Sequence, residues 1–139
     1  MKITNNYLDD LSLEVARQKF VGNPNVEITL GSAVKMPYKA NSFDYVTCAS
    51  SFHHHPDPEK SVREMVRVLK PDGTLLILDM CIDGPIRKLL FKIENIYHNE
   101  GKVFRLKNQE MLDLYIKEGL THIRQSTYLY FSLITEGVK

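Results

Sequence analysis

Hydrophobic and polar positions in the middle of the chain predict a strand, a helix and a second strand. Apolar residues dominate 43–49, as in a strand covered on both faces, and form another run at 75–78. Between these runs, apolar residues recur at helical spacing, at Val62, Met65, Val66 and Leu69. Asp57 can cap this helix, and Pro58 suits its first position. With a Pro-Asp-Gly turn at 71–73, the stretch predicts a βαβ unit of a parallel sheet.

A helix and a strand are predicted before this unit. Residues 9–20 show a helical pattern, and the Gly-Asn-Pro-Asn sequence at 22–25 ends it. The next run, 26–30, alternates in polarity and contains β-branched residues, which predicts a strand.

The pattern after residue 80 predicts two helices and a hairpin. The first helix has its apolar face over 86–97. Asn108 caps the second helix, and Gly119 ends it as a left-handed residue. Two β-rich runs near 122–128 and 130–135 are joined too tightly for a crossover, so we expect them to be antiparallel.

Length and composition predict a single domain over 1–139 with little net charge. Lysine and arginine total 18 and aspartate and glutamate 17, without a run of like charges, so neither nucleic acid nor an anionic membrane is expected as a partner. No apolar run reaches membrane-spanning length, and the first residues lack the apolar core of a signal peptide, so the cytoplasm is the expected location. Cys48 and Cys81 fall in or just after predicted strands, where reduced cysteine is usually a small buried hydrophobe.

Three landmarks in the central stretch carry a family resemblance. Asn-Ser-Phe-Asp at 41–44 enters the first strand of the βαβ unit, and a His-His pair followed by Pro-Asp-Pro-Glu-Lys at 56–60 leaves it. Arg-Val-Leu-Lys-Pro-Asp-Gly at 67–73 precedes the second strand. In this order and spacing they resemble the small-molecule branch of class I S-adenosylmethionine-dependent methyltransferases. The resemblance is close over 26–79 and looser elsewhere.

The resemblance implies an α/β, Rossmann-like methyltransferase fold. Its sheet is mostly parallel, of order 3-2-1-4-5-7-6 with a C-terminal antiparallel hairpin, and binds S-adenosylmethionine across the carboxyl ends of the first, second and fourth strands. It implies these cofactor contacts: Asp9 or Asp10 for the ribose hydroxyls, Ser32 and Ala33 for adenine, and Ala49, Ser50 and Ser51 for the methionine part. The family commonly has an acid where Ser32 stands, and a hydroxyl lacks the charge that strengthens such a bond.

The family's glycine-rich loop, which follows its first strand, has no counterpart in this sequence. The residues before Asp9, MKITNNYL, contain no glycine. We therefore expect an N-terminally truncated, partial domain without the first strand, the loop, the first helix and most of the second strand, and with weak or absent cofactor binding. Strand 26–30 would then lack its neighbour, and the edge of strand 43–49 would be unpaired. Strand 26–30 could pair with 43–49, a second copy or partner chain could supply the edge, or the chain could be a piece of a longer protein.

Three consecutive histidines are the main chemical feature of the sequence. Adjacent residues of an extended segment point in different directions, so His53, His54 and His55 are not expected to share a metal ion. In the family this loop faces the transferred methyl group, so the resemblance implies that all three lie beside the substrate, with His54 as the candidate base. Alternatively, His53 and His54 pack and hydrogen-bond to fix the loop. Asp44 and Asp79, near strand ends, could contact the cofactor or substrate, but bonds to backbone groups are the expected role.

Together these features predict an S-adenosylmethionine-dependent methyltransferase that acts on a small molecule. Its contribution would be to align sulfur, methyl and nucleophile and to exclude water. The alternative is a non-catalytic methyltransferase-like fragment that serves as a subunit or interaction module through its exposed strand edge. A nicotinamide-binding Rossmann protein would need its own glycine-rich turn, and a cysteine hydrolase would need a positioned Cys-His pair near Cys48.

Overall fold

The computed structural model describes residues 3–7, 10–80, 107–128 and 132–139, with side chains from Leu13 onward. The predicted helix over 86–97 and Cys81 lie outside the described residues. The described elements, in chain order, are β1 (Ile3–Tyr7), α1 (Asp10–Lys19), β2 (Val26–Leu30), β3 (Phe43–Ala49), the 3-10 helix η1 (Phe52–His54), α2 (Pro58–Val68), β4 (Leu69–Met80), α4 (Asn108–Lys117), β5 (Thr121–Tyr128) and β6 (Ser132–Val138).

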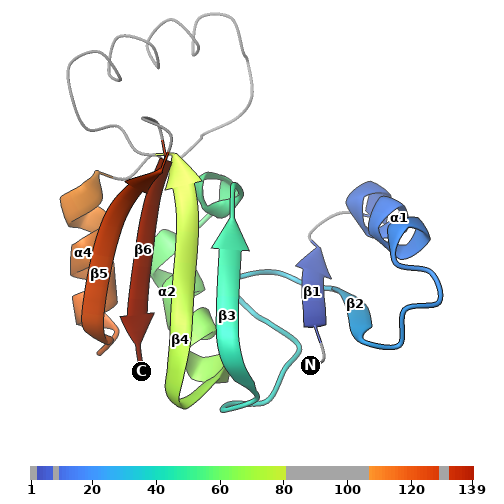
Figure 1. Ribbon diagram of the computed structural model, residues 1–139, viewed down its shortest axis with the longest axis horizontal. Helices are drawn as coiled ribbons and strands as arrows, with labels where there is room; N and C mark the ends of the chain where they lie inside the picture. The colour runs from blue at the N-terminus through green and yellow to red at the C-terminus, as the bar shows by residue number, and fades with distance from the viewer. Residues whose placement is uncertain (1–2, 8–9, 81–106, 129–131) are drawn as a thin grey trace, which may run out of the picture.

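A mixed four-stranded sheet of order β3-β4-β6-β5 forms the centre of the molecule (Figure 1). β3 and β4 are parallel and are joined through α2, which confirms the predicted βαβ unit. β6 runs antiparallel to both β4 and β5, which confirms the predicted hairpin. The strands thus have the order expected for the last four strands of the implied fold.

A separate pair of parallel strands, β1 and β2, lies beside this sheet. Ile3 pairs with Val26 and Tyr7 with Leu30, so the expectation that strand 26–30 would lack a neighbour is wrong. The neighbour was missed because Asn5 and Asn6 interrupt any apolar alternation over these residues. In Figure 1, β1 lies on the β3 side of β2. Among the described strands, β3 pairs only with β4, so its other edge forms no ladder with them.

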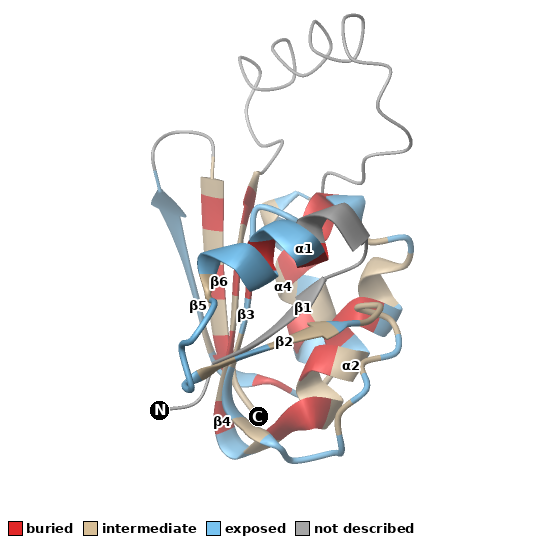
Figure 2. Ribbon diagram, turned by 90° about the vertical axis from the view of Figure 1, so that its right-hand side faces the viewer, coloured by how far each residue is buried: buried red, intermediate tan, exposed pale blue. Residues whose placement is uncertain are grey.

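Helices α2 and α4 cover one face of the four-stranded sheet (Figure 2). Asp57 caps α2 as predicted, because its Oδ1 accepts the Lys60 N–H at 3.0 Å. The core between these helices and the sheet contains Val62, Met65, Leu69, Leu75, Ile77, Met111 and Tyr115. This core fixes the positions of β3 and β4, whose carboxyl ends lie at the same edge.

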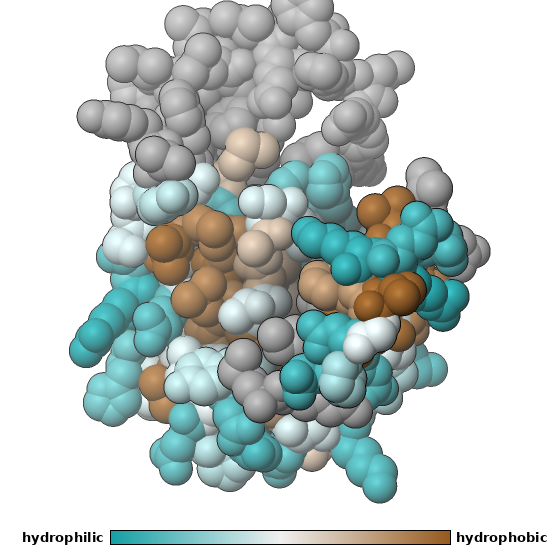
Figure 3. Space-filling view, turned by 45° about the vertical axis from the view of Figure 1, so that its right-hand side comes forward, coloured by the Kyte–Doolittle hydropathy of each residue, from teal (hydrophilic) through white to brown (hydrophobic). Residues whose placement is uncertain are grey.

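The opposite face of the sheet also carries apolar side chains. Alternation along the strands places Leu76, Leu78 and Ile134 on this side, and each is only half-buried. Figure 3 shows apolar side chains gathered on this face beside α1. Packing against α2 and α4 therefore leaves part of the apolar surface of the sheet uncovered.

The Pro-Asp-Gly sequence at 71–73 lies within β4 and does not form a separate loop. It coincides with an irregularity in the pairing of β4 with β3. Phe43 pairs with Leu69 but Tyr45 pairs with Thr74, so the register shifts between them. Asp72 has a left-handed φ of 62° within this segment. The Lys139 ammonium group also holds the junction, because it donates to carbonyl groups at the end of α2 and the start of β4, those of Val66 at 2.8 Å and Leu69 at 2.7 Å.

Helix α4 begins one residue earlier than the predicted cap would place it. Lys107 is the N-cap residue and Asn108 is the first helical residue, because the Lys107 N–H donates to Glu110 Oε2 at 2.8 Å. The prediction that Asn108 is the N-cap residue is therefore wrong by one position. Gly119 ends the helix with a left-handed φ of 80°, as predicted.

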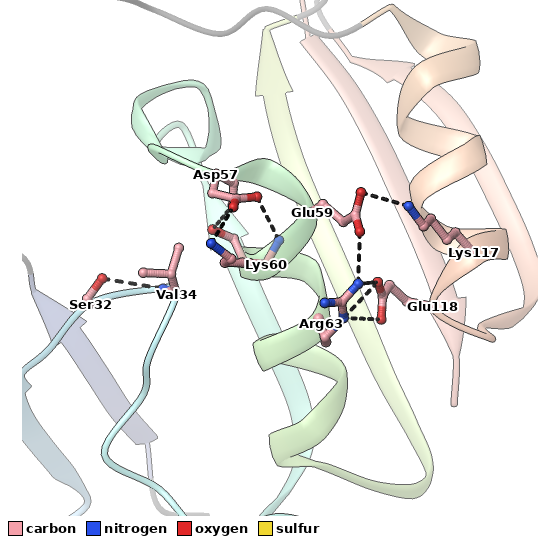
Figure 4. A network of polar contacts seen from close by, with 9 residues as sticks. Ser32, Val34, Asp57, Glu59, Lys60, Arg63, Lys117 and Glu118 are labelled. Atoms are coloured by element: carbon pink, nitrogen blue, oxygen red, sulfur yellow. Dashed lines mark hydrogen bonds and ion pairs between the residues drawn. The ribbon is translucent and has the colours of Figure 1, made fainter.

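An exposed ionic network links α2 to α4 (Figure 4). Arg63 Nη2 lies 2.8 Å from Glu59 Oε1 and 3.1 Å from Glu118 Oε1, and Lys117 Nζ lies 2.7 Å from Glu59 Oε2. The hydrogen bond from Lys117 is the largest influence that lowers the pKa of Glu59. Solvent screens such surface pairs, so the network contributes little to stability.

A second polar cluster holds the connection between β2 and β3 against α2. Glu64 Oε2 accepts the Met36 N–H at 3.0 Å, and Arg67 donates to the Tyr38 carbonyl at 2.9 Å. Glu64 and Arg67 are themselves paired at 2.7 Å. The segment after β2, which contains Ser32 and Ala33, is thereby tied to the helix of the βαβ unit.

Candidate functional site

The carboxyl ends of β3 and β4 form one edge of the sheet, because the two strands are parallel. Ala49 pairs with Leu78 at this edge, and the Ser50 N–H donates to the Leu78 carbonyl at 2.8 Å. Ala49, Ser50 and Ser51 are exposed, and Ser50 has a left-handed φ of 52°. A non-glycine residue in this conformation is uncommon and concentrates at functional sites. The edge therefore presents small side chains and an accessible backbone.

Helix η1 follows directly and is anchored by Phe52, which is 2% exposed. His53 is also buried, and its Nδ1 lies 2.6 Å from Oδ1 of Asp79 on β4. The His53 N–H donates to the other carboxylate oxygen, Oδ2, at 2.8 Å. Asp79 thus bonds backbone groups as expected, and in addition binds a side chain 26 residues away in the sequence. Asp44 instead pairs with Lys70 Nζ at 2.8 Å and is exposed.

His54 lies on the exposed side of the same turn. Its ring stacks on that of His53 with a centroid distance of 4.1 Å, and it makes no hydrogen bond with the described residues. Of the two histidines proposed to fix the loop, His53 is held through its ring by a hydrogen bond to a described residue, and His54 is not. His54 is therefore open to contact with a bound molecule.

His55 turns back toward β3 and is half-buried. Its Nε2 lies 4.0 Å from Cys48 Sγ, its ring lies 5.1 Å from that of Phe52, and its Nδ1 is buried without a partner. Burial lowers the pKa of His55, and the negative charge of Asp79 opposes this effect. His55 is therefore held as a neutral ring.

Replacing His55 with phenylalanine is expected to reduce the loss of stability at acidic pH. The unfolded chain binds a proton at His55 more readily than the folded chain does. The free energy of unfolding is therefore unaffected by His55 above the unfolded pKa, about 6.5, and decreases as pH falls below it. Urea unfolding of both proteins at about pH 7.5 and about pH 5.5 measures the difference. An equal or larger loss in His55→Phe would contradict the burial of a neutral His55.

Cys48 is a buried thiol. Its Sγ lies 3.3 Å from Ser51 Oγ, and burial raises its pKa to about 11. The cysteine hydrolase alternative needs a thiolate formed with help from a histidine, but neutral His55 at 4.0 Å does not lower the pKa of Cys48. This environment does not favour a nucleophilic role.

Cys48 is expected to resist alkylation in the native protein. At about pH 8 only about one thiol in a thousand would be ionised at this pKa, and iodoacetamide reacts with the thiolate. Peptide mapping by mass spectrometry after timed alkylation, in buffer and in urea, measures the protection. Alkylation of Cys48 in buffer as fast as in urea would contradict it.

Ser32 and Ala33 lie in a tight turn after β2. Ser32 forms an isolated bridge with Lys35, and its Oγ accepts the Val34 N–H at 3.4 Å (Figure 4). Both residues are half-buried. The hydroxyl bond is long, so Ser32 Oγ retains accepting capacity for a ligand.

Other predicted site residues fall where side chains are not described. Asp9 lies outside the described residues, and Asp10 begins α1 without a described side chain. Within the described segments, no three His, Cys, Asp or Glu side chains are grouped so that they could bind a metal ion. The structure thus brings the residues 49–51 and 53–55 together at one edge, with Asp79 of β4 bound to His53.

Comparison with known proteins identifies related families and folds. Residues 1–77 match the family described as "Methyltransferase domain". A demethylmenaquinone methyltransferase of Staphylococcus epidermidis is 34% identical over 103 residues, which cover 70% of this chain and 42% of that protein. The chain therefore spans about two-fifths of the length of this relative.

Solved structures share the fold over nearly the whole chain. The YcgJ protein of Bacillus subtilis has a TM-score of 0.82 at 19% identity, covering 99% of this chain and 82% of that one. A methyltransferase in complex with the Trm112 methyltransferase activator of Haloferax volcanii has a TM-score of 0.84 at 18% identity, covering 99% of this chain and 71% of that one. In the described part of the chain, no helix has the length and apolar character needed to cross a membrane.

Proposed function

The chain belongs to the methyltransferase domain family of class I S-adenosylmethionine-dependent methyltransferases, and from this membership we propose that it transfers a methyl group to a small molecule at the carboxyl ends of β3 and β4. The observation that carries the proposal is the arrangement at this edge. Small exposed residues and a strained Ser50 end β3, and the histidine turn follows them directly. In parallel sheets, ligands bind beyond the carboxyl ends of the strands.

The described residues fit part of S-adenosylmethionine. Ala49 and Ser50 leave room and backbone groups for the methionine part, and Ser32 Oγ can accept a hydrogen bond from the adenine amino group. We propose Asp9 or Asp10 for the ribose hydroxyls, since α1 follows β1 at this point of the chain. When bound, S-adenosylmethionine supplies a methyl group on a positively charged sulfur. The hydroxyl in place of an acid at Ser32 favours weak adenine binding.

The histidine turn is proposed to face the methyl acceptor. His54 is exposed and His55 is half-buried against Cys48, so the turn offers both an open ring and a partly apolar wall. The relatives named demethylmenaquinone methyltransferases suggest an aromatic acceptor as the first class to test. The cytoplasm remains our proposed location, in keeping with the free thiol of Cys48.

Isothermal titration with S-adenosylmethionine and with its demethylated product tests the proposed function. We expect saturable binding, weakened by the substitution Ser50→Pro, which cannot adopt the left-handed φ of this residue. Lys60→Ala, at an exposed position on α2, serves as the matched control and should bind like the original protein. Absence of heat at millimolar ligand would count against methyl transfer by this chain.

The free edge of β3 favours a second proposal, that this chain pairs with another copy or with a partner chain. Within the described strands, β3 has a ladder on one side only, and Tyr45 on this strand is 71% exposed. Unpaired edges recruit other strands. Light scattering should then show a dimer that Thr47→Lys weakens, because a charge on an edge strand opposes pairing. A dilute monomer for both proteins would contradict the edge as a pairing site.

A further inference from the structure

The buried Asp79 carboxylate makes three polar contacts. Asp79 is 6% exposed. Its Oδ2 accepts the His53 N–H at 2.8 Å, and its Oδ1 accepts the Met80 N–H at 2.7 Å. The same Oδ1 lies 2.6 Å from His53 Nδ1. The two residues come from different elements, η1 and β4, and are locked together at the proposed active edge.

These contacts assign the tautomer of the His53 ring. Both Asp79 oxygens already accept backbone N–H groups, so Asp79 acts as the acceptor and Nδ1 carries the hydrogen that it donates to Asp79. In the neutral ring, Nε2 then carries the free electron pair. No described residue hydrogen-bonds to Nε2, and the side chain keeps 11% of its surface exposed. The pair therefore fixes the orientation of the His53 ring at the end of the sheet, with no hydrogen bond from a described residue to Nε2.

Resting on the methyl transfer proposed above, we propose that His53 Nε2 accepts the proton of a weakly acidic hydroxyl on the methyl acceptor, with Asp79 as the positioning residue. The acceptor class is a phenol or enol. Its oxygen forms a bond to the methyl carbon as the carbon–sulfur bond breaks, and its proton passes to Nε2. The products are the methyl ether and S-adenosylhomocysteine, and the imidazolium later releases its proton to water.

This assignment differs from the prediction that His54 is the base. The His54 ring makes no hydrogen bond with the described residues, so no described contact selects its tautomer. His53 is held at two atoms by one carboxylate. Among the described residues, the titratable groups near His53 are Asp79 on β4 and the neighbouring His54 and His55, and Cys48 on β3 lies against His55. Of these, only Asp79 contacts Nδ1.

Nitrogen NMR tests the pair without any turnover. Long-range ¹⁵N–¹H correlation spectra of the protein should show His53 with its hydrogen on Nδ1 and an unprotonated Nε2 above neutral pH. Asp79→Asn should abolish the preference, because an amide can donate to Nδ1 as well as accept from it. A hydrogen on Nε2 in the original protein would overturn the proposal.

Methyl-transfer kinetics with two matched methyl acceptors test the role of His53 as the base. Catechol must lose a proton, whereas 4-nitrocatechol is already ionised near neutral pH. With catechol, His53→Gln should lower kcat by about a hundredfold or more and remove the fall in rate at acidic pH. With 4-nitrocatechol the loss should be less than about tenfold, and His54→Gln should lose less than about tenfold with either acceptor.

Several outcomes separate this inference from the proposed function. Equal losses with both acceptors, or a larger loss in His54→Gln, would overturn His53 as the base while leaving methyl transfer intact. Failure of the original protein to bind S-adenosylmethionine would instead overturn the proposed function. Thermal melts of each variant establish that it is folded. If Asp79→Asn does not fold, His53→Gln serves in its place, because the glutamine amide can still donate to Asp79.

Discussion

Replacing Tyr115 with alanine is expected to lower the free energy of unfolding by about 3–5 kcal/mol, the largest loss for any single substitution considered for this chain. Tyr115 is 0% exposed and lies between α4 and the sheet. Its hydroxyl donates to the Thr135 carbonyl at 3.0 Å. Truncation would leave a cavity in the core and remove this hydrogen bond, and both effects act in the same direction.

Urea denaturation measures this loss of stability. Two further variants show how much of it comes from the hydroxyl and how much from burial in the core. Tyr115→Phe removes only the hydroxyl and should cost about 1 kcal/mol. Ile116→Ala is the surface control, because Ile116 is the next residue of the same helix but is 58% exposed. It should change stability by no more than about 0.5 kcal/mol. Similar losses for Tyr115→Ala and Ile116→Ala would contradict the central position of Tyr115 in the core.

Replacing Gly73 with alanine is expected to cost about 1–3 kcal/mol through overpacking. An added Cβ would lie 2.8 Å from the Lys70 carbonyl oxygen and 3.1 Å from that of Asp44. Both are backbone atoms, so the start of β4 would have to move against β3. Because the shift in register occurs at this point, we also expect weaker protection of the β3–β4 ladder from hydrogen exchange.

The neighbouring Asp72 provides the control for Gly73. Asp72 has a left-handed φ, so Asp72→Gly relieves strain and should leave stability unchanged or slightly raised. The same urea titrations and exchange measurements apply to both variants. If Asp72→Gly lowers the free energy of unfolding as much as Gly73→Ala does, the segment is sensitive to any substitution. Overpacking at Gly73 would then not be the cause of the loss.

Local signals explain which parts of the fold the sequence predicts. The strands 26–30 and 43–49 and the helix capped by Asp57 follow from apolar period and capping chemistry, and the structure has each of them. β1 was missed because its pairing with β2 depends on backbone hydrogen bonds, which polar residues such as Asn5 and Asn6 also make. The cap of α4 was misplaced by one residue because Lys107 caps through its backbone.

The candidate site was predictable only in part, since its main contact is not local. The family resemblance identified the histidine turn and the small residues at 49–51, and the structure places them at one edge of the sheet. The pairing of His53 with Asp79 spans 26 residues and depends on the alignment of β3 with β4. An acid one residue before the end of the second strand of a βαβ unit was the available signal, but periodicity alone does not choose among the three histidines.

A titration of the ¹⁵N-labelled protein with S-adenosylhomocysteine, followed by backbone amide shifts, tests most directly the claim that the carboxyl end of β3 binds the cofactor. We expect saturable shifts centred on Ala49, Ser50 and Ser51, with a second set at Ser32 and Ala33. The amides of Arg124 to Ser126 on β5, at the far edge of the four-stranded sheet, should stay unchanged. Unchanged amides at 49–51 with millimolar ligand, or shifts confined to β5, would contradict the claim.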